Sequence, residues 1–417
     1  MFSQQTIHSI TDNQIGKLLL DGSSIYLKEA QELANALRNN TSVKTLDLSW
    51  NKLGSGLDNV VVSIENTNIS ELLLNHTMPT SESIKVLCQY VAKSTKLTKL
   101  ELGYNNLKND DLQELVNAAQ ANPSLAEMNL YLNTFDKLGT NLAAKLLNTH
   151  LTTLNLTNCG IGPDGDAIIG NALKTSGIKN LNLNNNDIGN VSNICTGLKY
   201  NHSIETLSLS GNAINDIGLK ELGNAIAEHP LLRALVLFDN QFTKTGFNEL
   251  CGFLSKNQVL RKLGLSLFNT DSELTHFHDL LASGIKELHL ITSLPFNDID
   301  MITIVHHLME NTGLVEFKSN YPILYVEGIT KRNALIAEKL DNDVREAIRA
   351  SRVISKLKLP MEIKLDILSH FLLGYKPNQI YKVSLFLLET LARKTLDFGN
   401  KFDANELWFQ AWKYYLK

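Results

Sequence analysis

Apolar and polar positions alternate in a short motif that recurs along most of this chain. The motif reads apolar residue, two variable positions, Leu, one variable position, Leu, two variable positions and often Asn. Leu46 and Leu48 are two positions apart, so on a strand both side chains point to one face while Asp47 points to the other. Each copy therefore predicts a short strand with one buried face. The central apolar residue recurs every 25 to 29 residues, at Leu18, Leu46, Leu72, Leu100, Met128, Leu154, Leu181, Leu207, Leu235, Leu263, Leu288 and Phe317.

A helix is predicted between successive strands. In residues 214–230, Asp216 is a suitable N-cap, apolar residues follow at helical spacing from Leu219, and Pro230 ends the pattern. One strand and one helix cannot bury their own apolar sides, so neighbouring repeats must stack and share a core. The pattern predicts a curved solenoid with parallel strands on the inside and helices on the outside.

The asparagine that follows many of the strands has a structural interpretation. Its side chain can hydrogen-bond backbone groups where the chain leaves the strand, and so it can join adjacent repeats. Cys159 occupies this position in its own repeat, where we expect a small buried side chain with a weak donor. The other asparagines of the series are Asn51, Asn105, Asn133, Asn186, Asn212 and Asn240.

With these motifs, residues 12 to about 325 resemble leucine-rich repeats, and the period with a full helix is similar to the ribonuclease-inhibitor-like subclass. The clearest copies are VKTLDLSWNKL from Val43 and IKNLNLNNNDI from Ile178. The resemblance implies an α/β fold of about twelve strand-helix repeats, with the parallel sheet on the concave face. We expect the solenoid to span residues 1–325, with an N-terminal cap over about 1–14, and an all-α module to span 326–417.

The C-terminal module contains the segment KLPMEIKLDILSHFLLGY from Lys358, which resembles the opening of an F-box. That resemblance implies docking of residues 358–400 onto a Skp1-type adaptor, with the repeats selecting a substrate for ubiquitination. The alternative is a helical cap that covers the exposed apolar end of the solenoid. The residues on the usual F-box positions are Leu359, Pro360, Glu362, Ile363, Ile367 and Leu368.

Composition and charge exclude several classes of protein. A chain of 417 residues with 43% apolar residues is not disordered, and its four cysteines have neither disulfide nor zinc spacing. A net charge of −4 gives no basic field for nucleic acid, and no apolar stretch approaches the roughly 20 residues of a membrane span. HExxH, P-loop and GxSxG motifs do not occur, and the GxGxxG match at Gly160, Gly162 and Gly165 occupies an ordinary strand-to-helix turn. We therefore expect no enzymatic activity, no cofactor and no metal.

The concave face offers the candidate binding surface. Its outward side chains include aromatic and acidic residues, which form hot spots in protein interfaces because they bury much area with little loss of rotamer freedom. The alternative is that the rings pack across neighbouring strands. The candidate partner-binding residues are Asp47, Trp50, Glu101, Tyr104, Asn129, Tyr131, Phe238 and His289.

The sequence therefore predicts a monomeric, non-enzymatic scaffold for protein interactions. The N-terminus lacks the basic leader and apolar core of a secretory signal, so we expect a cytoplasmic protein. The asparagine-rich repeats resemble those of translocated effectors of intracellular bacterial pathogens. This resemblance implies type IV secretion into the host cytosol without a cleaved signal peptide, a role in virulence and a host protein as partner.

Overall fold

The computed structural model describes residues 3–267, 274–292, 304, 308 and 313–319. It divides the chain into two compact units, of which unit 1 comprises residues 1–285 and 290–295 and unit 2 comprises residues 286–289 and 296–417. The predicted helical module at 326–417 and its F-box-like segment lie outside the described residues. The predicted boundary at residue 325 therefore stays a prediction.

The strands form one sheet in which their order follows the chain. From β1 to β10, neighbouring strands pair in parallel, and the central residues of adjacent motifs face each other, as Leu18 faces Leu46. The twelve predicted strands and their parallel arrangement are thereby confirmed. The strands are β1 Lys17–Leu19, β2 Thr45–Asp47, β3 Glu71–Leu73, β4 Lys99–Glu101, β5 Glu127–Asn129, β6 Thr153–Asn155, β7 Asn180–Asn182, β8 Thr206–Ser208, β9 Ala234–Leu237, β10 Lys262–Leu267, β11 Glu287–Thr292 and β12 Glu316–Ser319.

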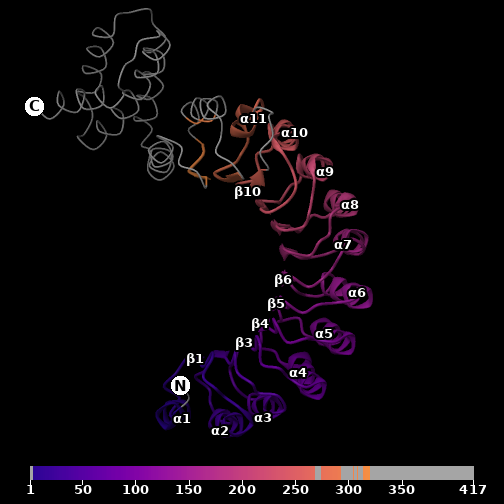
Figure 1. The fold of residues 1–417 in the computed structure, drawn as a ribbon. Helices are drawn as coiled ribbons and strands as arrows, with labels where there is room; N and C mark the ends of the chain where they lie inside the picture. The colour runs from indigo at the N-terminus through magenta and orange to yellow at the C-terminus, as the bar shows by residue number, and fades with distance from the viewer. Residues whose placement is uncertain (1–2, 268–273, 293–303, 305–307, 309–312, 320–417) are drawn as a thin grey trace, which may run out of the picture. The chain divides into compact units, whose positions relative to one another are not determined.

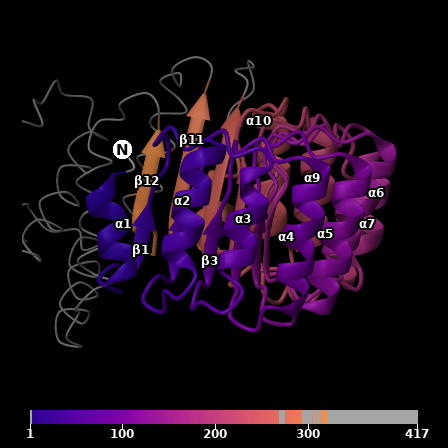
Figure 2. The ribbon, with the colours of Figure 1, turned by 90° about the horizontal axis from the view of Figure 1, so that it is seen from below.

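A helix follows each strand from β1 to β10. In unit 1 the strands line the inner side of an arc and the helices line its outer side (Figure 1). Figure 2 shows helices α2 to α5 next to one another in chain order, in agreement with their packing contacts. The helices are α1 Gln4–Thr11, α2 Leu27–Leu37, α3 Gly56–Ser63, α4 Ser81–Lys93, α5 Asn109–Ala121, α6 Lys137–Leu146, α7 Gly165–Leu173, α8 Ser192–Tyr200, α9 Asp216–Ile226, α10 Lys244–Leu254 and α11 Phe277–Ala282.

Helix α9, Asp216–Ile226, begins one residue earlier than the sequence predicted. Asn215, not Asp216, is the N-cap of α9, and its side chain accepts a hydrogen bond from the Gly218 N–H at 3.1 Å. The Asp216 carboxylate reaches the next repeat instead, where it accepts hydrogen bonds from the N–H of Thr243 at 2.7 Å and from its hydroxyl at 2.8 Å. A polar side chain at a helix start can thus hold the neighbouring repeat as well as its own helix.

The predicted asparagine ladder is present, and Asn133 illustrates it. Its Nδ2 donates to the carbonyls of Leu102 and Leu130 at 3.0 and 2.9 Å, while its Oδ1 accepts from the N–H groups of Asn105 and Leu107 at 3.1 Å each. Asn133 is fully buried, so these backbone groups have no access to water. An amide side chain supplies donors and acceptors together, and one residue therefore satisfies the turns of two adjacent repeats.

Cys159 confirms its predicted role in the ladder. Its thiol is buried and donates to the Leu130 carbonyl at 3.2 Å, where an asparagine would place its Nδ2. Burial raises the pKa of Cys159 to about 12. The same cause raises the pKa of Cys88 and Cys195 to about 12 and that of Cys251 well above its usual value. All four thiols therefore stay protonated at neutral pH, which removes the nucleophilic thiolate form.

A second ladder, which the sequence analysis missed, follows the helices. Asn122 is fully buried, donates from Nδ2 to the Val91 carbonyl at 2.8 Å and accepts at Oδ1 from the N–H groups of Ser124 and Leu125. The same bonds recur at Asn40, Asn201 and Asn257. These asparagines stand three residues before the first apolar residue of the strand motif, and this spacing is visible in the sequence.

The residue just before the first ladder position has a left-handed backbone in nine successive repeats. Its φ lies between 52° and 66° at Gly22, Trp50, His76, Tyr104, Leu132, Asn158, Asn185, Gly211 and Asp239. Glycine, asparagine and aspartate tolerate this conformation best, while bulkier residues pay a steric penalty of about 1 to 2 kcal/mol. The left-handed turn is therefore common to all nine repeats, whatever the side chain. The bulky residues at four of these positions do not favour this backbone conformation, so another reason must account for them.

We expect Asn133→Ala to lower the free energy of unfolding by about 2 to 4 kcal/mol, because it leaves buried carbonyl and N–H groups without partners. Asn129→Ala is the matched control, since half-buried Asn129 accepts one local hydrogen bond from the Tyr131 N–H at 3.2 Å. Thermal and urea unfolding monitored by circular dichroism measure both variants. Equal loss of stability in the two would contradict the role assigned to the ladder.

At two exposed positions, glycine and alanine variants should differ in stability in opposite directions. At Trp50, with φ of 60°, we expect the glycine variant to be about 1 kcal/mol more stable than the alanine variant. At Gln89, exposed within α4, we expect the alanine variant to be the more stable by about the same amount. Urea unfolding of the four variants measures the ranking, and alanine ahead of glycine at both positions would refute it.

Candidate functional site

Three of the left-handed positions carry rings that lie against one another on neighbouring repeats. The ring centroids of Trp50 and His76 are 4.7 Å apart, and those of His76 and Tyr104 are 4.6 Å apart with an angle of 17° between the ring planes. Trp50 and Tyr104 are 53% and 45% exposed, so their rings are not part of the core. We call Trp50, His76 and Tyr104 the aromatic row.

The backbone makes the aromatic row conspicuous. Five of the other repeats supply glycine, asparagine or aspartate at the same turn position and one supplies Leu132, whereas these three supply large rings with φ of 52° to 60°. Bulky residues in the left-handed region persist only when the surrounding structure holds them, and they gather at functional sites. The scaffold does not need rings here, so the aromatic row is the best candidate for a functional surface.

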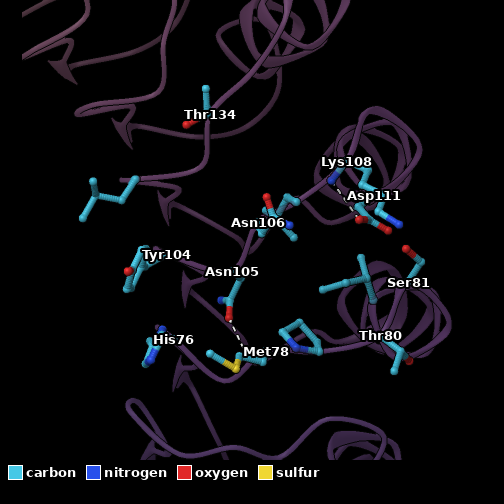
Figure 3. A pocket seen from close by; sticks show the side chains of 14 residues that line it. His76, Met78, Thr80, Ser81, Tyr104, Asn105, Asn106, Lys108, Asp111 and Thr134 are labelled. Atoms are coloured by element: carbon cyan, nitrogen blue, oxygen red, sulfur yellow. Dashed lines mark hydrogen bonds between the residues drawn. The ribbon is translucent and has the colours of Figure 1, made fainter.

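A cavity of 740 Å³, which we call the rim groove, begins at the aromatic row. Figure 3 shows His76 and Tyr104 on the strand side of this cavity and Thr80 and Ser81 on the helix side. The groove crosses the strand-to-helix loops that follow β3, β4 and β5. Its lining is mixed, with apolar side chains between polar ones, and consists of His76, Met78, Pro79, Thr80, Ser81, Ile84, Tyr104, Asn105, Asn106, Leu107, Lys108, Asp111, Leu132 and Thr134.

Hydrogen bonds fix the backbone beneath the aromatic row. Asn75 accepts at Oδ1 from the Gly103 N–H at 2.7 Å and donates from Nδ2 to Glu101 Oε2 at 2.6 Å. Glu101 also forms an ion pair with Lys99 at 2.8 Å, and this hydrogen bond raises the pKa of the Lys99 ammonium. The loops that carry His76 and Tyr104 are therefore tied together by side chains of β4 and of the turn after β3.

Of the predicted binding residues, the structure brings Trp50 and Tyr104 together. Their ring centroids are 6.1 Å apart, with His76 in contact with both. Glu101 lies on β4 but is engaged with Lys99 and Asn75, as described above. Asp47, the last residue of β2, accepts a hydrogen bond from the Ser49 N–H at 2.9 Å and so stabilises the turn that follows the strand. Asp47 and Glu101 thus support the turns around the aromatic row.

Two predicted aromatic residues pack onto neighbouring glycines. A Cβ atom on Gly103 would come within 2.0 Å of the Tyr131 ring, so this ring lies over the glycine of the preceding repeat. Phe238 covers Gly264 in the same way, with a closest approach of 2.6 Å. Both rings are half-buried and follow the cross-strand alternative that the sequence left open. Any role for Tyr131 or Phe238 in binding stays a prediction.

The remaining predicted residues lie apart from the aromatic row. Asn129 accepts from the Tyr131 N–H and so caps the end of β5. His289 lies on β11 in unit 2, where its Nε2 is 3.1 Å from Glu316 Oε1. A role for either residue in partner binding stays a prediction.

Three exposed or half-exposed residues of this surface, His76, Met78 and Leu132, were not predicted from the sequence. In the repeat of His76, Thr77 replaces the ladder asparagine, so the motif there was not among the clearest copies. Met78 is 50% exposed and also has a positive φ, of 50°. The signal that could have found His76 and Leu132 is their place directly before the ladder position. Aligning that column alone would have shown Trp, His, Tyr and Leu in four successive repeats.

In the described part of the chain, every helix is too short or too polar to cross a bilayer.

Comparison with known proteins agrees with the architecture. A family model described as leucine-rich repeat matches residues 39–56, 93–116, 147–165 and 200–223. The human NACHT, LRR and PYD domains-containing protein 13 is 28% identical over 274 residues, which cover 65% of this chain and 24% of that protein. The ribonuclease inhibitor of Sus scrofa is 28% identical over 265 residues, covering 60% and 57%. The chain therefore spans about a quarter of the first relative and just over half of the second.

Among solved structures, an internalin of Listeria monocytogenes has a TM-score of 0.44 at 18% identity, covering 78% of this chain and 87% of that chain. The repeat period, the parallel sheet in chain order and the matches to the leucine-rich-repeat model and to ribonuclease inhibitors lead to one assignment. The chain is built of leucine-rich repeats and is similar to proteins of the ribonuclease-inhibitor kind.

Proposed function

We propose that this protein is a non-enzymatic interaction scaffold that binds a partner protein through the inner face of its N-terminal repeats. Leucine-rich-repeat proteins serve as scaffolds for protein interactions. The aromatic row and the adjoining rim groove are the principal contact in this proposal. Asp47 on β2, Asn129 on β5 and Tyr131 just after β5 would contribute at its border.

The exposed aromatic row at strained backbone positions is the observation that carries the proposal. Trp and Tyr are enriched among the residues that dominate binding energy in protein interfaces. The three rings support one another, with centroid distances of 4.6 to 6.1 Å, so they hold their positions before a partner arrives. Because a preorganised surface loses less rotamer freedom on association, more of the contact energy remains as affinity.

The rim groove gives the surface a recess beside its rings. Its 740 Å³ lies within the range of about 300 to 1,000 Å³ that is typical of small-molecule pockets. The half-exposed Met78 and Leu132 offer apolar contact there, and Met side chains adapt to different shapes. In our proposal a partner side chain inserts into the groove while the neighbouring part of the partner covers the rings.

The proposed setting is the cytosol of a host cell. The asparagine-rich repeats resemble those of translocated bacterial effectors, and the chain is 28% identical to mammalian repeat proteins over more than half its length. These two likenesses support an effector that a bacterium delivers by type IV secretion and that acts as a monomer on a host protein. A virulence role and residence in the host cytosol belong to the same proposal.

We expect the double variant Trp50→Ala, Tyr104→Ala to bind the partner about 10-fold more weakly or worse, since truncated hot spots lose that much or more. Affinity capture from host lysate with the full chain identifies the partner, and titration calorimetry with the purified partner measures the affinity. Tyr200→Ala is the matched control, because Tyr200 is 64% exposed on helix α8. Unchanged affinity of the double variant, in a folded protein, would place the partner on another surface.

A second candidate function rests on the Leu359, Pro360, Glu362 and Ile363 spacing, which resembles the opening of an F-box. In this alternative the chain is a substrate adaptor that docks residues 358–400 onto a Skp1-type subunit of a ubiquitin ligase. The scaffold function of the repeats is the same in both candidates, because the repeats would select the substrate.

Binding to purified Skp1 separates the two candidates. If the chain is an adaptor, the full chain should retain Skp1 in a pull-down, and Leu359→Ala with Pro360→Ala should abolish retention by removing apolar contacts at the helix start. Lys364→Ala, which changes a position outside the F-box-like set, should retain it. No retention by the unsubstituted chain, or retention that survives the double substitution, rules out the adaptor.

A further inference from the structure

Three potential metal ligands meet on β11 and β12 of unit 2. Glu287 and His289 are two positions apart on β11, so both side chains point to the same face of the strand. The Lys286 carbonyl accepts hydrogen bonds from the N–H groups of Val315 and Glu316 at 2.7 and 3.0 Å. This pairing places Glu316, the first residue of β12, beside Glu287.

The spacing of the three side chains suits a single ion. One nitrogen or oxygen atom from each residue lies within 4.8 Å of the other two, and His289 Nε2 is 3.1 Å from Glu316 Oε1. Around a tetrahedral zinc ion with bonds of about 2.0 to 2.2 Å, ligand atoms are roughly 3.3 Å apart. His289 Nε2 and Glu316 Oε1 thus lie near the separation that two zinc ligands require.

The surroundings of the cluster attract a cation. The Glu287 and Glu316 carboxylates bring two negative charges to one imidazole, and the Lys318 ammonium forms an ion pair with Glu316 Oε1. The Lys318 side chain is 66% exposed and can leave for solvent when another cation takes its place. His289, by contrast, is held with only 16% of its side chain exposed.

We infer that Glu287, His289 and Glu316 bind a divalent transition-metal ion, and that the ion is Zn²⁺. One imidazole nitrogen with carboxylate oxygens is a ligand set that zinc accepts, whereas Ca²⁺ and Mg²⁺ take oxygen ligands. The two carboxylates balance the charge of the ion. With three protein ligands, one coordination position remains for water, and the ion links β11 to β12 through side chains.

Calorimetric titration of the full chain with Zn²⁺ at neutral pH tests this inference, with Mg²⁺ as the comparison ion. We expect one Zn²⁺ site that His289→Ala and Glu316→Gln each weaken about 10-fold or more, as the loss of a metal-supporting group does. Lys318→Met should strengthen binding by up to about fivefold, the size of effect that an exposed ion pair has. The matched control is His8→Ala, because His8 is an exposed histidine paired with Asp12 at 3.2 Å.

Each result decides for or against the site. Weaker Zn²⁺ binding in both ligand variants, with unchanged binding in His8→Ala and little response to Mg²⁺, supports it. Absence of Zn²⁺ binding by the full chain, or binding that survives either ligand substitution, overturns it. Circular dichroism of each variant in the absence of metal shows whether it is folded. The Lys318→Met variant keeps all three ligands, so tighter Zn²⁺ binding by this variant supports the site independently of the weaker binding expected for the ligand variants.

Discussion

The fold depends on satisfying the peptide groups that stacking removes from water. Each repeat is too small to have a core, so it buries its turns against its neighbours, and buried N–H and C=O groups without partners are costly. Asn133 on one side of the repeats and Asn122 on the other answer this requirement with the same chemistry. An amide has two donor hydrogens on its nitrogen and a separate acceptor oxygen, whereas a hydroxyl or thiol has one donor hydrogen and must accept at the same atom. Cys159 keeps the donor bond but has no counterpart of the amide oxygen.

This constraint also determines where variation is possible. The ladder side chain must point inward, so the residue before it turns outward through a left-handed backbone. That residue contributes little to the core, and its side chain can differ from repeat to repeat. Trp50, His76 and Tyr104 use this freedom, and their rings meet because consecutive repeats present the position side by side. A binding surface thereby arises from the same turn that closes the hydrogen bonds of the scaffold.

Periodic features were predictable from the sequence, and contacts between particular side chains were not. The leucine spacing gave the strands, their register and the inward face, and the asparagine column gave the first ladder. The cap of α9 was assigned to Asp216 instead of Asn215, because both residues suit a helix start and only the neighbouring Thr243 decides between them. The packing of Tyr131 over Gly103 depends on two residues from different repeats. The same holds for the meeting of Glu287 and His289 with Glu316, which requires the alignment of β11 with β12.

The nine left-handed positions have a consequence for how such a protein changes over generations. They lie in successive repeats, one to a repeat, and none of the nine residues is buried. A single nucleotide change at one of these codons can add a side chain to the exposed surface or remove one from it, while the hydrogen bonds of the ladder stay intact. Leu132 stands next to Tyr104 in this series, and Asn158 stands next to Leu132. A lineage could therefore lengthen, shorten or shift the contact surface by one repeat at a time, and new partners could be acquired without passing through unfolded intermediates.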